Sequence, residues 1–391
     1  LFIDFVQLLY ERFHNERARP GSADGAPAEG GPQQGLRVLA PWFDPRLLAD
    51  AEADCRTRGI VKVTDVIVGA SHVASIQRGP VEVFVDVVFE SNFTECTAQG
   101  ALPSLYVTER WTFRRKAGVL SKGPGDITAL ACPSCGNPSA LRPDGTCPYC
   151  GRVVNNGDFQ WVVCASMVLQ AVPRPPVDLV GGGLLGGAYE AGTDLPTRYA
   201  PDFEPARQAF AARNPEFAWD VFERRVRTIF VELQQAWTQK QWAKARPYET
   251  DALFNRHRYW MDMYARQGLT NKLEDINVGQ VVAVRFSLDA WYDRITVRIF
   301  ATMRDYTVNV AGQPVSGDAR TPRPFSEYWT FIRRATTRGA VAPKGERQCP
   351  SCGAPLEVSM AGDCAYCGTR VTSGEFDWVL SSIEQDEAYR G

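Results

Sequence analysis

Eight of the eleven cysteines form four Cys-x-x-Cys pairs, a spacing that turns two thiolates toward one metal ion. The pairs combine into two sets with identical internal spacing. The sets are Cys132, Cys135, Cys147 and Cys150, and Cys349, Cys352, Cys364 and Cys367. Four thiolates complete a tetrahedral shell and leave no position for water. The spacing therefore predicts two structural Zn²⁺ ions, one for each four-cysteine site.

Two other chemistries of four cysteines remain open at this point, namely paired disulfides and an iron centre of the rubredoxin type. A loop of this size cannot form a core, so bound metal would supply most of its folding energy, about 10–16 kcal/mol in zinc-finger peptides. A glycine follows each pair and permits the left-handed backbone of a knuckle. The other three cysteines, Cys55, Cys96 and Cys164, are interpreted as small buried apolar residues.

The sequence on either side of the cysteines is also repeated. Glu109–Phe113 (ERWTF) parallels Glu327–Phe331 (EYWTF), and Gly157–Val162 (GDFQWV) parallels Gly374–Val379 (GEFDWV). This order indicates a tandem duplication of a unit of about 170–190 residues. The expected organisation is a first domain at 1–172, a Gly/Pro-rich linker at 173–200 and a second domain at 201–391. Each domain contains a zinc ribbon, at 130–153 in the first and at 347–370 in the second. The first domain also has a flexible insertion at 20–35.

Hydrophobic periodicity places helices before strands in both copies. Helices are expected at 1–17, 44–58 and 217–237, with one or two further helices at 242–267. Strands are expected at 60–76, 81–90, 106–114 and 159–169, and again at 275–288, 295–303, 327–333 and 376–383. Each cysteine set falls between the last two strands of its copy. The pattern predicts an α+β fold in which helices pack on a curved antiparallel sheet and a zinc ribbon is inserted in the last β-hairpin.

Composition excludes several classes of protein. The chain has 391 residues, 45% hydrophobic residues and a net charge of −2, which is typical of folded domains and gives no basic field for nucleic acid. No apolar run reaches the roughly 20 residues that a membrane span needs. The segment Leu1–Tyr10 already has the pattern of a helix, so we expect further sequence upstream of Leu1.

Signatures of catalysis are missing from the sequence. It has no phosphate-binding glycine loop, HExxH or GxSxG motif. His14 and His257 lie on expected helices and are interpreted as solvated or capping residues. The helices of the second copy are rich in aromatic residues, which suit a core by default and, alternatively, an apolar cleft for a peptide, a lipid or a partner helix.

The repeated unit Glu-x-Trp-Thr-Phe, Cys-Pro-x-Cys-Gly, Cys-x-Tyr-Cys-Gly, Gly-x-Phe-x-Trp-Val resembles the zinc-ribbon-bearing bacterial members of the Tim44-like domain family. That family is named after a peripheral subunit of the mitochondrial inner-membrane import translocase. The resemblance implies a cystatin-like fold related to the nuclear transport factor 2-like fold. It also implies a binding role, often at a membrane, and ribbon ligands at the eight cysteines.

These observations lead to the hypothesis of a non-enzymatic, zinc-stabilised protein-binding scaffold, a membrane-associated subunit or accessory factor of a larger assembly. Its expected partners are proteins, including a membrane complex, with no nucleic acid and no diffusible small-molecule substrate. The expected location is the cytoplasmic side of a membrane, reached through sequence upstream of Leu1 or through a partner, with a soluble cytoplasmic protein as the alternative. The alternative functions are a hydrolase or isomerase in a cleft of the curved sheet, and a ribbon-mediated nucleic-acid binder.

Overall fold

The structure is a computed structural model. It describes residues 2–18, 35–121, 131–137, 141–142, 144–173, 194–337, 348–359 and 362–391. Residues 20–34 of the expected insertion and 174–193 of the expected linker lie outside the described residues. The chain divides into two compact units, Leu1–Pro176 and Val177–Gly391.

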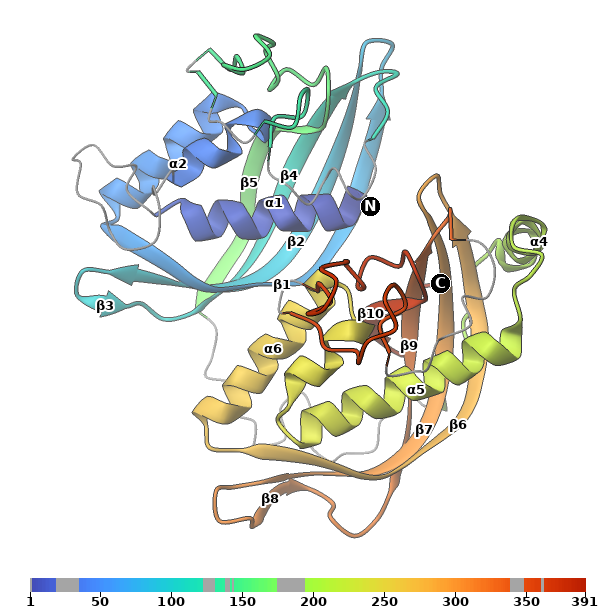
Figure 1. The fold of residues 1–391 in the computed structure, drawn as a ribbon. Helices are drawn as coiled ribbons and strands as arrows, with labels where there is room; N and C mark the ends of the chain where they lie inside the picture. The colour runs from blue at the N-terminus through green and yellow to red at the C-terminus, as the bar shows by residue number, and fades with distance from the viewer. Residues whose placement is uncertain are drawn as a thin grey trace. The chain divides into compact units, whose positions relative to one another are not determined.

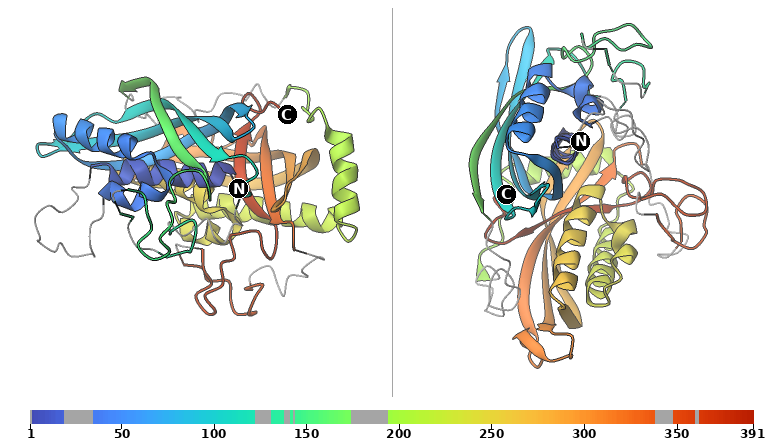
Figure 2. Two further views of the ribbon diagram at one scale, coloured as in Figure 1. Left: turned by 90° about the horizontal axis from the view of Figure 1, so that it is seen from above. Right: turned by 90° about the vertical axis from the view of Figure 1, so that its left-hand side faces the viewer.

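The first unit packs its helices on one face of a curved antiparallel sheet (Figure 1). Its helices are α1 (Phe2–Glu16), the 3₁₀ helix η1 (Gly35–Trp42) and α2 (Pro45–Thr57). Its strands are β1 (Ile60–Arg78), β2 (Glu82–Thr97), β3 (Gly100–Ala101), β4 (Leu105–Lys116) and β5 (Val162–Pro173). The strand order is β1-β2-β4-β5, and β3 pairs with β2. The right-hand view of Figure 2 looks along α1 and shows this sheet curving around it.

The second unit repeats this arrangement. Its helices are α4 (Phe203–Arg213), α5 (Trp219–Thr238), the 3₁₀ helix η3 (Trp242–Tyr248) and α6 (Asp251–Arg266). Its strands are β6 (Thr270–Leu288), β7 (Tyr292–Val308), β8 (Pro314–Gly317), β9 (Arg323–Arg334) and β10 (Val379–Gln385). The order β6-β7-β9-β10, with β8 beside β7, matches the first sheet strand for strand. Each expected helix and strand is present, with ends that differ by up to seven residues, as in β2, which continues from the expected end at Glu90 to Thr97. The short elements η1, β3 and β8 and the helix α4 were not expected from the sequence.

Both long first strands bend at an aspartate in the left-handed conformation. Asp65 has φ 55° in β1 and Asp275 has φ 53° in β6, and each lies at a break in the pairing register with the next strand. Aspartate tolerates this conformation better than most residues. A bulge of this kind adds a local bend and twist, so the sequence itself sets the curvature that wraps each sheet around its helices.

The cores lie between the helices and the concave face of each sheet. In the first unit, α1 contributes Phe5, Val6 and Leu9, which pack toward Trp111 of β4. In the second, Val226, Phe230 and Leu233 of α5 are buried against Ile295, Val297 and Ile299 of β7, whereas Val221 of the same helix is half-buried. The two units therefore have separate cores of the same construction.

The convex side of β7 is less exposed than the alternating sequence predicts. Arg298 lies on that side and is nevertheless buried. Its guanidinium donates to the carbonyl oxygen of Leu195 at 2.8 Å and forms an ion pair with Asp386 at 3.0 Å. Residues 194–200, which the sequence analysis counts within the linker, thus contact the second sheet together with the C-terminal segment. Among the described residues, no helix is both long and apolar enough to span a membrane.

Candidate functional site

The structure brings the four cysteines of each set together. Their Sγ atoms lie within 4.8 Å of one another in both clusters. In the first cluster the separations are 4.0 Å for Cys132–Cys150 and 3.9 Å for Cys135–Cys147. In the second they are 3.9 Å for Cys349–Cys367 and 4.0 Å for Cys352–Cys364. A tetrahedron with metal–sulfur bonds of about 2.3 Å has sulfur–sulfur edges of about 3.8 Å, so the spacing fits one ion at each cluster.

These separations also argue against disulfide bonds between the four cysteines of each cluster. A disulfide has a sulfur–sulfur bond of about 2.05 Å, roughly half of the shortest distance found here. All eleven cysteines are free thiols in the structure. The clusters are therefore candidate four-thiolate metal sites, and their sulfur donors suit zinc and iron alike.

The same backbone turn holds each Cys-x-x-Cys pair. The glycine after the pair donates its N–H to the carbonyl of the first cysteine, at 2.8 Å for Gly136 and 2.9 Å for Gly151. Gly353 and Gly368 make the equivalent bonds at 2.8 and 2.9 Å, and all four glycines have positive φ between 68° and 80°. The expected left-handed glycine is thus confirmed at all four turns. The first cysteine of each pair is buried and the second is more exposed.

Each cluster lies in the connection between two strands that pair with each other, β4 and β5 or β9 and β10. In both units, a backbone hydrogen bond joins the last part of this connection to the end of the strand that precedes it. Lys116 donates its backbone N–H to Gly157 at 3.0 Å, and Arg334 donates to Gly374 at 2.7 Å. In the second unit, Arg370 also reaches Asp251 at the start of α6 at 3.3 Å. The sheet therefore anchors both connections at their bases, and α6 adds a contact in the second unit.

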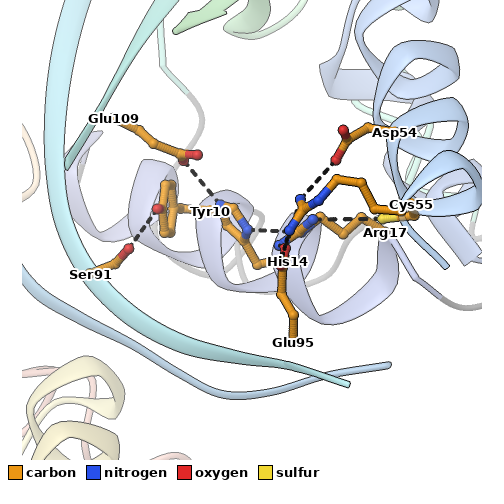
Figure 3. A network of polar contacts seen from close by, with 9 residues as sticks. Tyr10, His14, Arg17, Asp54, Cys55, Ser91, Glu95 and Glu109 are labelled. Carbon is orange, nitrogen blue, oxygen red and sulfur yellow. Dashed lines mark hydrogen bonds and ion pairs between the residues drawn. The ribbon is translucent and has the colours of Figure 1, made fainter. Parts of the chain in front are cut away.

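The first unit contains a buried polar network under α1 (Figure 3). His14, only 2% exposed, lies 3.1 Å from Glu109 of β4 through its Nε2. Arg17 donates its Nε–H to Nδ1 of His14 at 3.2 Å and forms an ion pair with Glu95 of β2 at 2.6 Å. Arg58, which follows α2, also binds Glu95 through both terminal nitrogens. Two buried carboxylates are thus balanced by two guanidinium groups around one histidine.

Tyr10 and Cys55 complete this network. The hydroxyl of Tyr10 lies 2.7 Å from Oγ of Ser91, and burial, together with the charge of Glu109, raises the pKa of Tyr10. The Sγ of Cys55 lies 3.6 Å from Nη1 of Arg17. Burial also raises the pKa of the Cys55 thiol, which keeps it in its unreactive protonated form. The network therefore holds no activated nucleophile at Cys55.

The partners of His14 fix its tautomer. An arginine has only donors, so Nδ1 of His14 must accept the bond from Arg17. Nε2 then carries the proton and donates it to Glu109. Burial lowers the pKa of His14 below its ordinary value of 6.5, and this outweighs the opposite effect of Glu109. His14 is consequently neutral, and both of its ring nitrogens are occupied.

This neutral state predicts a pH dependence of stability. The unfolded chain takes up a proton on His14 near its ordinary pKa of 6.5, whereas the folded first unit resists it. The contribution of neutral His14 to the free energy of unfolding is therefore complete above this pH. It is lost as the pH falls toward the lower pKa of His14 in the folded unit. We expect the urea midpoint of the first unit to fall more between about pH 7.5 and 5.5 in the native chain than in His14→Gln. Equal slopes in the two proteins would contradict this assignment.

The second unit fills the same places with other residues. Phe2 of α1 packs edge-to-face on Phe113 at 5.6 Å, and Phe222 of α5 packs in the same way on Phe331 at 5.6 Å. Counting along the helices from these two rings places Phe230, Gln234 and Trp237 at the positions of Tyr10, His14 and Arg17. The charged network therefore belongs to the first unit and is not required by the fold.

The expectation that His14 and His257 are solvated or capping residues is wrong. His14 is buried within the network, and His257 is half-buried, with its Nδ1 2.6 Å from Oε1 of the buried Glu249. Neither residue is solvated or capping. A usable signal was present, because Tyr10, His14 and Arg17 follow one another at helical spacing on the face of α1 that should be apolar.

The other three cysteines and the aromatic residues behave mainly as packing groups. Cys55 is buried as expected, whereas Cys96 and Cys164 are only half-buried. Cys164 lies at a bulge of β5, and its Sγ contacts the carbonyl oxygen of Thr112 at 3.4 Å. Most of the aromatic residues of the second helices are in the core, including Phe222, Phe230, Trp242, Phe254 and Tyr264. This favours the core interpretation over an aromatic cleft.

Comparison with known proteins finds one family model that matches part of the second unit. Residues 204–341 match the family model described as the Tim44-like domain. A Tim44-like domain is thus present from α4 to just beyond β9, and the match ends before Cys349. No curated protein matches the chain. A solved structure named "Ntf2 like protein involved in plasmid conjugation" aligns at 9% identity over 98% of this chain and 96% of its own, with a TM-score of 0.20.

Proposed function

We propose that this protein is a non-catalytic protein-binding scaffold, stabilised by two structural Zn²⁺ ions, that serves as a membrane-associated subunit or accessory factor of a larger assembly. The observation that carries the proposal is the Tim44-like domain at residues 204–341 together with two four-thiolate clusters. Tim44-like domains interact with membrane protein complexes, which favours protein partners at a membrane.

The chemistry of the clusters supports a structural role for the metal. Four sulfur donors close the coordination shell, so no position remains for a water or a substrate. Zinc is proposed over iron because Zn²⁺ has no redox chemistry. It also has no geometric preference of its own, so four thiolates can surround it as a tetrahedron. When bound, the ion would cross-link the two knuckles of each loop. The cysteines and their glycine turns would hold the loop in one conformation.

The clusters also offer a surface for protein contacts. The second knuckle of each cluster carries a tyrosine between its cysteines, and Tyr149 and Tyr366 are both exposed. Exposed aromatic residues on rigid turns are well suited to protein interfaces, because they contribute large contact areas at little cost in conformational entropy. A metal-fixed loop would thus present the same side chain in both units.

The alternative of an enzyme rests on the buried network of His14, Glu109 and Tyr10. Both ring nitrogens of His14 already hold protein partners, and the ring is stacked on Phe93 at 4.7 Å. A general base needs a free nitrogen within reach of its substrate. The network therefore supports a packing role, which agrees with the proposed scaffold.

The proposal is tested in native extracts with a chain tagged at its genomic locus. Membranes are solubilised in mild detergent and the extract is separated by size. We expect the chain to migrate with other proteins in a complex much larger than its own 43.4 kDa, and to leave that complex when Cys147 and Cys364 are both replaced by serine. A chain that stays free and monomeric in the extract would contradict the scaffold function.

A further inference from the structure

The strand β5 of the first sheet has one side without a partner strand. The sheet order is β1-β2-β4-β5, so β5 pairs with β4 on one side only (Figure 1). Phe43 and Asp44 cover the start of the other side, through a parallel bridge to Val163 and a backbone hydrogen bond of 2.9 Å to its carbonyl oxygen. From Ala165 to Pro173, none of the described residues pairs with this outer side. Every second residue of an edge strand directs its N–H and C=O groups outward, so this edge can accept another strand.

β5 also lacks the charges that usually protect the edge of a sheet. The other outer strands, β1, β6 and β10, each carry charged residues, such as Lys62, Lys272 and Glu384. β5 has the sequence VVCASMVLQAVP and carries none. An uncharged, apolar edge strand of this length is a template for pairing with another chain. Four of its apolar side chains are 38–56% exposed, namely Met167, Val168, Leu169 and Val172.

The second unit does not extend its sheet in this way. β10 ends at Gln385, opposite Glu327, which is the counterpart of Glu109 in the repeat. Val168 lies opposite Glu109, and β5 continues beyond it through residues 169–173. After β10 the chain instead turns at Asp386, which forms an ion pair on the convex side of the sheet. The long open edge therefore belongs to the first unit and is not required by the fold.

Segments of the same chain are poorly suited to cover this edge. In the second unit, the segment before α5 is α4, whose Phe203 and Phe210 pack on Phe286 of β6 at 5.7 and 5.0 Å. β6 and β10 are at opposite sides of that sheet, so a segment of the same kind before α1 would lie at β1 and not at β5. The linker residues 174–193, outside the described residues, include six Gly and two Pro, which strands avoid.

The strand that suits this edge is β5 of a second copy of the chain. The occupant must be extended, because only an extended backbone meets a row of outward N–H and C=O groups. When a strand pairs antiparallel with its own copy, a charge near the two-fold axis faces a like charge, and β5 has no charge to do so. A bulge at Leu169 divides the open edge into two regular segments, 165–168 and 170–173. The first segment of one copy can therefore pair with the second segment of the other.

We propose that β5 pairs antiparallel with β5 of a second copy of this chain, around a two-fold axis at Leu169. Residues 165–168 of each copy then lie opposite residues 170–173 of the other, and the two sheets of the first units become one continuous sheet. Such a dimer goes beyond the proposed scaffold function, which holds equally for a single copy bound to other proteins. Pairing through one strand buries less surface than a standard interface of about 1,600 Å², so we expect a dissociation constant on the order of micromolar.

Sedimentation velocity of the purified full chain, at concentrations from about 1 to 200 µM, tests the dimer. We expect the mass to rise toward twice 43.4 kDa as the concentration increases. Leu169→Lys brings two like charges together at the axis and should raise the dissociation constant at least about tenfold. Ile76→Lys is the matched control, because Ile76 is an exposed apolar residue of β1, at the other side of the same sheet. A native chain that stays monomeric, or a Leu169→Lys chain that dimerises as the native chain does, would overturn the proposal.

A mixture of two charge variants tests the two-fold axis. Leu169→Lys and Leu169→Glu should each be monomeric, because each sets like charges against one another. An equal mixture of the two should form dimers, because opposite charges then meet at the axis. A mixture that stays monomeric would show that Leu169 does not face its own copy, and this result also overturns the proposal.

The occupant of the edge is identified by two further measurements. Hydrogen exchange of residues 165–173 should slow as the concentration rises, whereas equal protection at all concentrations would show that a segment of the same chain covers the edge. Two differently tagged copies should co-purify from native extracts and should separate when both carry Leu169→Lys. Copies that never co-purify, or that co-purify regardless of Leu169, would overturn the dimer. If the chain still migrates in its large complex in that case, the scaffold function stands and only the pairing of β5 is wrong.

Discussion

Replacing Cys147 or Cys364 with serine is expected to remove one of two zinc ions and to unfold the loop that carries the cluster. Both cysteines are buried, and each is the first residue of its pair. A structural zinc site contributes about 10–16 kcal/mol to the folding of its loop, so losing one thiolate removes most of the loop's stability. Metal analysis should fall from two zinc ions per chain to one. Hydrogen exchange should become fast in the affected loop alone.

Cys96→Ser is the matched control for this prediction. Cys96 is half-buried in β2 and belongs to neither cluster, so its replacement should leave the metal content at two. The two cluster variants also serve as controls for each other, because each loop is anchored in its own unit. A cluster variant that keeps two zinc ions and a protected loop would show that the cysteines are not ligands.

Replacing Glu95 with alanine is expected to destabilise the first unit by about 3–5 kcal/mol, the usual cost of leaving a buried charge without its partner. Glu95 is 2% exposed and is the carboxylate on which Arg17 and Arg58 converge. Its loss leaves the buried guanidinium of Arg17 without an anionic partner. The measurement is the urea unfolding of the full chain, with hydrogen exchange to assign the transition to the first unit.

The control for Glu95 is an exposed carboxylate. Glu52 pairs with Arg56 along α2 at 3.9 Å, and Glu52→Ala should cost less than about 1 kcal/mol because water screens the pair. The second unit should keep its own transition in both variants. Equal destabilisation by Glu95→Ala and Glu52→Ala would show that the network does not support the fold.

The sequence predicted the features that depend on local spacing. The four knuckles follow from Cys-x-x-Cys-Gly, since two sulfurs and a left-handed glycine are set within five residues. The end of α6 at Arg266 follows from Gly268, whose φ of 65° is the left-handed conformation that glycine favours just after a helix. Strand positions came from alternation, and the repeat placed the clusters between the last two strands of each copy.

The sequence could not predict what depends on register between distant strands. His14, Glu95 and Glu109 are unremarkable separately, and only the pairing of β2 with β4 under α1 joins them. α4 was missed because it has few large apolar residues besides Phe203 and Phe210. The burial of Arg298 likewise depends on residues 194–200, whose sequence resembles a linker.

X-ray absorption at the zinc edge, combined with metal analysis of the purified full chain, tests the central claim most directly. We expect two zinc ions per chain, each with four sulfur neighbours at about 2.3 Å and no oxygen or nitrogen ligand. Such a closed shell would mean that the metal holds the scaffold together and performs no chemistry. A site with an oxygen or nitrogen neighbour, or one filled by iron, would show that the clusters are not closed structural zinc sites.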